Sequence, residues 1–172
     1  MKKLIYLFLV LPLLFSSCAK EKGCTDSQAS NYNGDAEEDD GSCTYDITGV
    51  WETTSATLNG QEVFSGVWGL ELHYVFTDGT MGFELYDLTG NLTSYSSQGT
   101  ANLVAGDPNV LSWSGTVYDP VDPNGIPAAI TINIDKLTNA TNMTWRYVDY
   151  PSASDTYVKT LVKSSTYSLA DW

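Results

Sequence analysis

The side chains that could do chemistry in this chain are few, apart from a large excess of carboxylates. The 172 residues include three cysteines, one histidine, 21 Asp and Glu and 8 Lys and Arg, for a net charge of −13. A nucleic-acid interface needs clustered Lys and Arg to neutralise phosphates, so this balance excludes that class of partner. One histidine and three cysteines are also too few for a Cys/His zinc cluster if two of the cysteines form a disulfide.

The polar side chains show no arrangement that is typical of an active site. The histidine, His73, follows Glu71 by two positions and lies on the strand face opposite Leu72 and Tyr74, so we expect a solvent-facing imidazole. No serine stands in a nucleophile-elbow setting, and the strand pattern places no pair of carboxylates together in a cleft. We therefore expect a protein that is not an enzyme.

Residues 1–17 have the features of an export signal. Two lysines precede an apolar run over residues 4–15 that is too short to span a bilayer, and two serines lead to Cys18. The stretch 14–18 (LFSSC) resembles the lipobox of bacterial lipoproteins, in which the cysteine is acylated and becomes the first residue after cleavage. This resemblance implies palmitate or a similar acyl chain on Cys18 and anchoring to the bacterial outer membrane, on its periplasmic or cell-surface side. The alternative is an ordinary secretory signal with a nearby free thiol.

The next segment carries the other two cysteines. If lipid occupies Cys18, Cys24 and Cys43 remain in an oxidising compartment, and we expect them to form a disulfide. Closing a loop of about twenty residues removes about 3 kcal/mol of denatured-state entropy, which helps a segment too small to build a core. The pattern GCTD, NYN and DDGSC over residues 23–43 resembles a short cysteine-clipped module of secreted and surface proteins in two-membrane bacteria. We expect residues 18–45 to form a lipidated, acidic spacer.

Carboxylates in this spacer raise the question of a cation. Asp35, Asp39 and Asp40 are candidate ligands, because calcium prefers oxygen donors of this kind. The spacing does not fit an EF-hand, because Ala36 stands where that loop needs glycine and Ser42 stands where it needs a bidentate glutamate. A solvated acidic spacer is favoured, with a calcium site as the alternative.

From Ile47 onward the chain alternates apolar and polar residues, which predicts β-strands. Turn residues separate the alternating runs, and Asp78-Gly79 is typical of a tight hairpin. Short connections favour sequential antiparallel pairing. Eight strands are predicted, at residues 49–58, 67–77, 80–87, 92–104, 110–119, 128–137, 142–150 and 155–163.

Such a meander buries its apolar face either in a closed barrel or in a two-layer sandwich. The opening stretch 46–52 (DITGVWE) resembles the G-x-W strand of the lipocalin-like superfamily, in which the tryptophan closes one end of an eight-stranded up-and-down barrel. By that resemblance, Lys159 or Lys163 is the candidate for the basic residue that many members place over this tryptophan. The barrel is favoured over the sandwich for residues 46–164, and residues 165–172 are expected to form a C-terminal tail with a short turn.

The alternation also predicts the barrel interior. A barrel of this size either fills with its own side chains or holds one small molecule, and both possibilities stay open. The even-numbered residues from 68 to 76 are expected to face inward and their odd-numbered neighbours to face water. The predicted lining consists of Trp68, Leu70, Leu72, Tyr74, Phe76, Phe83, Leu85, Leu111, Trp113, Ile130, Ile132, Ile134, Met143 and Trp145.

These features together lead to one functional hypothesis and one rival. The first is a membrane-anchored lipoprotein that binds a small apolar or amphipathic ligand in the barrel, through Trp68, Tyr74, Phe83, Trp113 and Trp145. The rival is a surface interaction module with a solid barrel, whose exposed loops, particularly 119–127, bind carbohydrate or protein.

Overall fold

The computed structural model describes residues 20–64, 69–104, 107–148 and 155–172. The chain divides into two compact units. The first includes the described part of residues 1–27 together with 31–43, and the second includes residues 28–30 and 44–172. Within the described ranges, no helix is both long enough and apolar enough to cross a membrane.

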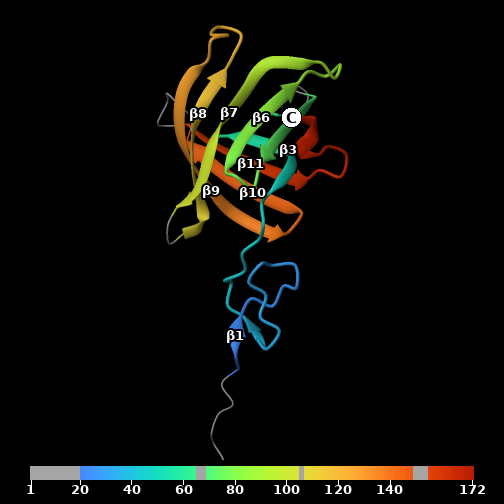
Figure 1. The fold of residues 1–172 in the computed structure, drawn as a ribbon, viewed down its shortest axis with the longest axis vertical. Helices are drawn as coiled ribbons and strands as arrows, with labels where there is room; N and C mark the ends of the chain where they lie inside the picture. The colour runs from blue at the N-terminus through green and yellow to red at the C-terminus, as the bar shows by residue number, and fades with distance from the viewer. Residues whose placement is uncertain (1–19, 65–68, 105–106, 149–154) are drawn as a thin grey trace, which may run out of the picture. The chain divides into compact units, whose positions relative to one another are not determined.

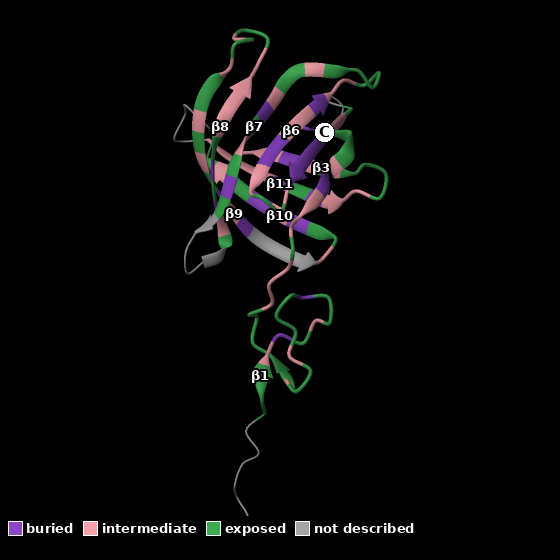
Figure 2. Cartoon of the chain, viewed as in Figure 1, coloured by how far each residue is buried: buried purple, intermediate pink, exposed green. Residues whose placement is uncertain are grey.

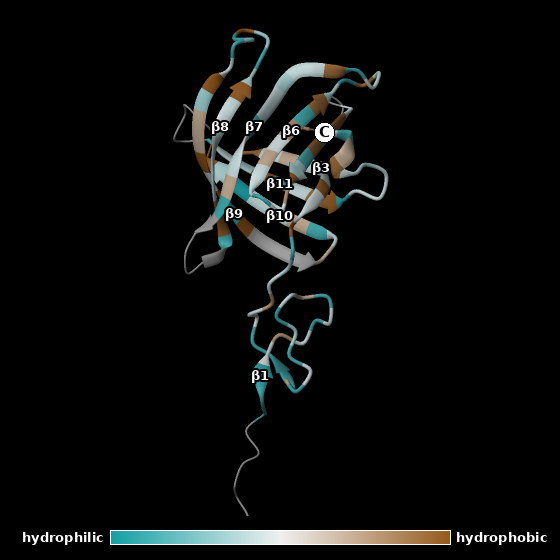
Figure 3. Cartoon of the chain, in the orientation of Figure 1, coloured by the Kyte–Doolittle hydropathy of each residue, from teal (hydrophilic) through white to brown (hydrophobic). Residues whose placement is uncertain are grey.

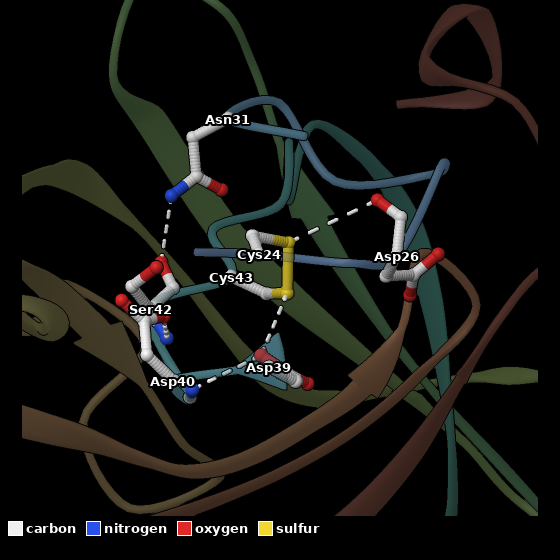
Figure 4. Close-up of a disulfide and its surroundings, with 8 residues drawn as sticks. Cys24, Asp26, Asn31, Asp39, Asp40, Ser42 and Cys43 are labelled. Atoms are coloured by element: carbon white, nitrogen blue, oxygen red, sulfur yellow. Dashed lines mark hydrogen bonds between the residues drawn. A yellow bond between two sulfur atoms is a disulfide. The ribbon is translucent and has the colours of Figure 1, made fainter. Parts of the chain in front are cut away.

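The small N-terminal unit is held by the predicted disulfide. Cys24 and Cys43 are bonded with an S–S distance of 2.01 Å, next to a parallel pair of short strands, β1 (Lys22–Gly23) and β2 (Glu38–Asp39) (Figure 4). Asp39 Oδ1 accepts a hydrogen bond from the backbone N–H of Gly41, and Asp40 Oδ1 accepts one from Ser42. These carboxylates therefore stabilise local turns.

The calcium alternative gains no support from this unit. Asn33 Oδ1 accepts a hydrogen bond from the Asp35 backbone N–H, so this side chain also stabilises a local turn. Among the residues with described placement, no group of three or more His, Cys, Asp or Glu side chains could hold a metal ion.

The second unit is a closed, eight-stranded antiparallel up-and-down barrel, as the sequence predicted (Figure 1). Each strand pairs with the next along the chain, and β11 pairs with β3 to close the barrel, which excludes the sandwich. A short outer strand, β4 (Gln61–Glu62), pairs with β3. The barrel strands are β3 (Gly49–Leu58), β5 (Leu70–Val75), β6 (Thr80–Tyr86), β7 (Leu92–Val104), β8 (Asp107–Tyr118), β9 (Ile126–Asn139), β10 (Asn142–Val148) and β11 (Thr156–Lys163).

Trp51 lies fully buried at one end of the barrel interior. Its Nε1 donates a hydrogen bond to the Ile47 carbonyl at 2.7 Å, and Lys163 Nζ lies 5.7 Å from the centre of its ring. Of the two lysines proposed from the resemblance, Lys163 is therefore the one over the tryptophan. The buried side chains packed with Trp51 are Val75, Met81, Ala101, Leu111, Trp113, Ile132, Ile134, Met143, Trp145 and Leu161.

The predicted orientation of β5 is wrong. In the strand pairing, Trp51 lies opposite His73 and His73 lies opposite Phe83, so the odd-numbered face of β5 is the inner one. Leu72 and Tyr74 belong to a separate buried cluster, on the outer side of the barrel wall. That outer cluster also contains Val50, Leu70, Phe76, Tyr86 and Leu169.

The C-terminal segment explains why an outward face is apolar. A short 3₁₀ turn, η1 (Leu169–Asp171), brings Leu169 into the outer cluster, and the Trp172 ring lies 4.7 Å from the Tyr74 ring. Trp172 also packs over Gly82, where an added Cβ would lie 2.5 Å from the indole. Both faces of β5 are therefore buried, and period-two alternation does not distinguish them.

Hydropathy and burial both follow the strands. Hydrophobic and hydrophilic bands alternate along the barrel (Figure 3), and most buried residues lie on its strands (Figure 2). The β5–β6 hairpin also forms as predicted: the Phe76 backbone N–H donates to the Thr80 carbonyl at 2.9 Å, and Gly79 takes a φ of +88° that favours glycine.

The contact of the C-terminal segment with the barrel wall should contribute measurably to stability. We expect Trp172→Ala to lower the free energy of unfolding by about 1–2 kcal/mol, because the indole is only 36% exposed and contacts Tyr74 and Gly82. Leu88→Ala is the matched control, since Leu88 is 66% exposed, and should change stability by less than about 0.5 kcal/mol. Urea unfolding measures both; equal effects would contradict the packing described.

Candidate ligand-binding cavity

The barrel interior is hollow on one side. A cavity of about 470 Å³ lies among strands β5 to β11, so the side chains do not fill the barrel. A volume of this order is sufficient for a small organic ligand. Most of its wall is apolar. The lining residues are His73, Met81, Gly82, Phe83, Ser97, Trp113, Val117, Asp119, Ile126, Ala128, Ile130, Ile132, Trp145, Tyr147 and Lys159.

Three of the five predicted ligand-binding residues line this cavity: Phe83, Trp113 and Trp145. Trp113 is fixed in the wall because its Nε1 donates to the Met81 carbonyl at 3.1 Å. Tyr74 is a correction: it lies on the outer wall against Trp172, and its hydroxyl donates to Glu84 at 3.1 Å. Trp68 lies outside the described residues.

A buried polar cluster, Thr53, Glu71, His73 and Lys159, lies inside the barrel and was missed from the sequence. Lys159 Nζ donates to Glu71 Oε1 at 2.5 Å, and Thr53 Oγ1 donates to the same oxygen at 2.9 Å. His73 Nε2 also lies in hydrogen-bonding contact with Glu71 Oε1. The expected solvent-facing His73 is therefore wrong, since this imidazole is buried beside a buried ion pair.

The charges in this cluster depend on one another. Burial by itself raises the pKa of the Glu71 carboxyl, but Lys159 and His73 more than offset it and hold the pKa well below its usual value. Burial lowers the pKa of the Lys159 ammonium, yet Glu71 and Tyr147 reverse this and the net pKa is raised. Burial lowers the pKa of His73 despite the opposing effect of Glu71, so we take the imidazole as neutral.

Aromatic rings surround these polar groups. The Trp145 ring lies 4.7 Å from His73 in an edge-to-face arrangement. Lys159 Nζ lies 5.7 Å from the Phe83 ring centre and 5.6 Å from that of Tyr147, distances at which an ammonium is attracted to a π face. The Lys159 ammonium thus lies near two aromatic rings and is also paired with Glu71.

A second cavity of about 290 Å³ adjoins the first. Phe83, Tyr147 and Lys159 contribute to both walls and therefore lie between the two spaces. Glu71 lines only the smaller cavity, and His73 lines only the larger one. The remaining walls of the smaller cavity come from Ala56, Val63, Phe64, Leu85, Tyr95 and Tyr157.

The comparisons with known proteins assign neither a family nor a ligand. No protein-family model matches the chain, and no curated protein matches its sequence. A crystal structure of an LTBP1 LTC4 complex is similar over 70% of this chain and 68% of that chain, with a TM-score of 0.48 and 14% sequence identity. The geometry of the cavities is therefore the basis for a functional proposal.

The buried ion pair predicts a characteristic pattern of stability losses. We expect Glu71→Met and Lys159→Met each to lower the free energy of unfolding by about 3–5 kcal/mol, because each leaves an uncompensated buried charge. The double variant should lose less than either single variant, since no unpaired charge remains. Chemical unfolding of the three variants measures this; additive losses would show that the two charges do not interact.

The lowered pKa of His73 predicts a pH dependence of stability that can be assigned to this one side chain. Its pKa is lower in the folded protein than in the unfolded chain, so the unfolded state binds more protons as the pH falls. Stability should therefore be constant between about pH 7.5 and 9 and fall by up to about 1.4 kcal/mol between about pH 6.5 and 5.5. His73→Gln should abolish this loss, because the chain has no other histidine. Urea midpoints that rise as the pH falls in this range would contradict a neutral buried imidazole.

Proposed function

We propose that the barrel reversibly binds a small apolar or amphipathic molecule and carries out no chemistry on it. The observation that supports this best is the 470 Å³ cavity, whose wall combines Phe83, Trp113 and Trp145 with aliphatic side chains. Burial of apolar ligand surface against such a wall is the main source of affinity in sites of this kind. The polar side chains nearby already have structural roles, because Thr53 and Lys159 both donate to Glu71.

We also propose that the protein is tethered to the bacterial outer membrane through acylated Cys18, as the leader resembles that of a lipoprotein. Acyl chains gain about 0.8 kcal/mol per buried methylene, so several chains on one cysteine give stable anchoring. The disulfide-bonded acidic unit would then lie between the anchor and the barrel along the chain. Mass spectrometry of the membrane-bound protein should find acyl chains on Cys18, and an unmodified thiol would refute the anchor.

The rival proposal, a surface module that binds carbohydrate or protein through loop 119–127, rests on two exposed apolar side chains. Within this range, Val121 is 92% exposed and Ile126 is 39% exposed. The neighbouring backbone is ordered by Asp119, whose Oδ1 accepts hydrogen bonds from Val121 and Asp122 at 2.7 Å each. Exposed apolar residues that stand singly are common on protein surfaces, whereas a cavity lined by rings is not. We therefore favour binding inside the barrel.

Titration with neutral polyaromatic probes, followed by tryptophan quenching, tests this proposal. Trp113 and Trp145 lie in the cavity wall and should report an occupant directly. Ala128→Trp, which fills the cavity, should weaken binding at least about tenfold. Ala129→Trp is the matched control, because Ala129 is the next residue of β9 and is exposed.

Two results would count against binding inside the barrel. One is the absence of saturable quenching across a broad panel of probes, which would move the favoured function to the loop-binding module. The other is equal affinity of the Ala128 and Ala129 variants, which would place the probe outside the cavity.

A further inference from the structure

We propose that the ligand carries a neutral hydrogen-bond donor, such as a hydroxyl group, and that the smaller cavity holds this group against Glu71 Oε2. The inference rests on the proposed function, because it names the chemical class of the molecule bound in the barrel. It adds a polar subsite to a cavity otherwise defined by apolar contacts.

The first step is the distribution of donors around the Glu71 carboxylate. Thr53, His73 and Lys159 all contact Oε1. Within the described part of the chain, no group donates to Oε2. The Glu71 side chain is 9% exposed, and Oε2 is not among the fully buried polar atoms without a partner, so this oxygen keeps access to open space. A carboxylate offers about four lone-pair sites, so Oε2 has free acceptor capacity for a further donor.

The second step is the location of that oxygen. Glu71 lines the smaller cavity and not the larger one. Since Oε1 is surrounded by the three donors of the cluster, Oε2 is the atom left to face the open space. A ligand donor placed there would complete the hydrogen bonding of Glu71 without displacing Lys159 or Thr53.

The third step is the shape and composition of the wall. Five aromatic rings line the smaller cavity together with Ala56, Val63 and Leu85, so the body of the ligand meets apolar surface on most sides. The rings belong to Phe64, Phe83, Tyr95, Tyr147 and Tyr157. A hydroxyl group next to an alkyl or ring portion matches one buried acceptor within such a wall.

The fourth step is charge. Among the described residues that line the smaller cavity, Glu71 and Lys159 are the charged ones, and they neutralise each other. A ligand carboxylate would bring a second negative charge toward Glu71, and a ligand ammonium would bring a second positive charge toward Lys159. Either charge would stay uncompensated in a desolvated space. A neutral donor avoids both costs.

A series of ligands with one tail and different head groups tests the inference in the wild-type protein. Decanol, methyl decyl ether, decanoate and decylamine compete for a bound polyaromatic probe, and the displacement gives their affinities. Decanol should bind at least about tenfold more tightly than each of the others, because sites built to pair with a hydroxyl reject analogues that lack it.

A matched variant identifies Glu71 as the acceptor. In Glu71→Met with Lys159→Met, decanol and the ether should bind with affinities within about twofold of each other. The variant must still bind the polyaromatic probe, which shows that its barrel is folded. If it does not fold, the wild-type series alone decides the question.

The outcomes separate this inference from the proposed function. The inference is overturned if the ether or decanoate binds as tightly as decanol, or if decylamine binds more tightly than decanol. It is also overturned if a tenfold preference for decanol persists in the double variant. If the probe binds and no member of the series displaces it, the polar subsite is refuted and binding inside the barrel stands. If neither the probe nor the series binds, the proposed function itself fails.

Discussion

The ion pair between Glu71 and Lys159 constrains the strands that form one side of this barrel. The two residues come from β5 and β11, which flank β3, and Thr53 of β3 donates to the same carboxylate oxygen. A shift of β5 by one residue would turn Glu71 to the outside and leave the Lys159 ammonium buried without its partner. Because an unpaired buried charge costs several kcal/mol, the pair selects one register and one inner face.

Two consequences of this constraint shape the rest of the molecule. With Glu71 and His73 turned inward, the apolar residues Leu72 and Tyr74 face outward, and the C-terminal segment covers them with Leu169 and Trp172. Inside, Lys159 lies between the Phe83 and Tyr147 rings, so the polar cluster sits where the two cavities meet. The Glu71–Lys159 pair thus determines which residues of β5 pack on the outer wall, and it lies where the interior divides into two cavities.

Much of the architecture follows from the sequence, because strands and turns are encoded locally. The eight strands, the closed meander, the Cys24–Cys43 disulfide and the cavity positions of Phe83, Trp113 and Trp145 were predicted. The inner face of β5 was predicted wrongly, since alternation assigns polar residues to water and contains no information about a partner 88 residues away. Glu71 and His73 stand at alternate positions of an otherwise apolar strand, which could have indicated a polar cluster on the inner face. That interpretation requires Lys159 as the partner of Glu71, and the local pattern does not identify this partner.

The orientation of β5 is the central claim, and proton–proton nuclear Overhauser effects measure it most directly. In the isotope-labelled protein, the His73 ring should show cross-peaks to Trp145 and Phe83, whose rings lie 4.7 Å and 5.8 Å away between centres. The Tyr74 ring should show cross-peaks to Trp172. Cross-peaks from Leu72 or Tyr74 to Trp145, with a solvent-exposed His73, would contradict the account.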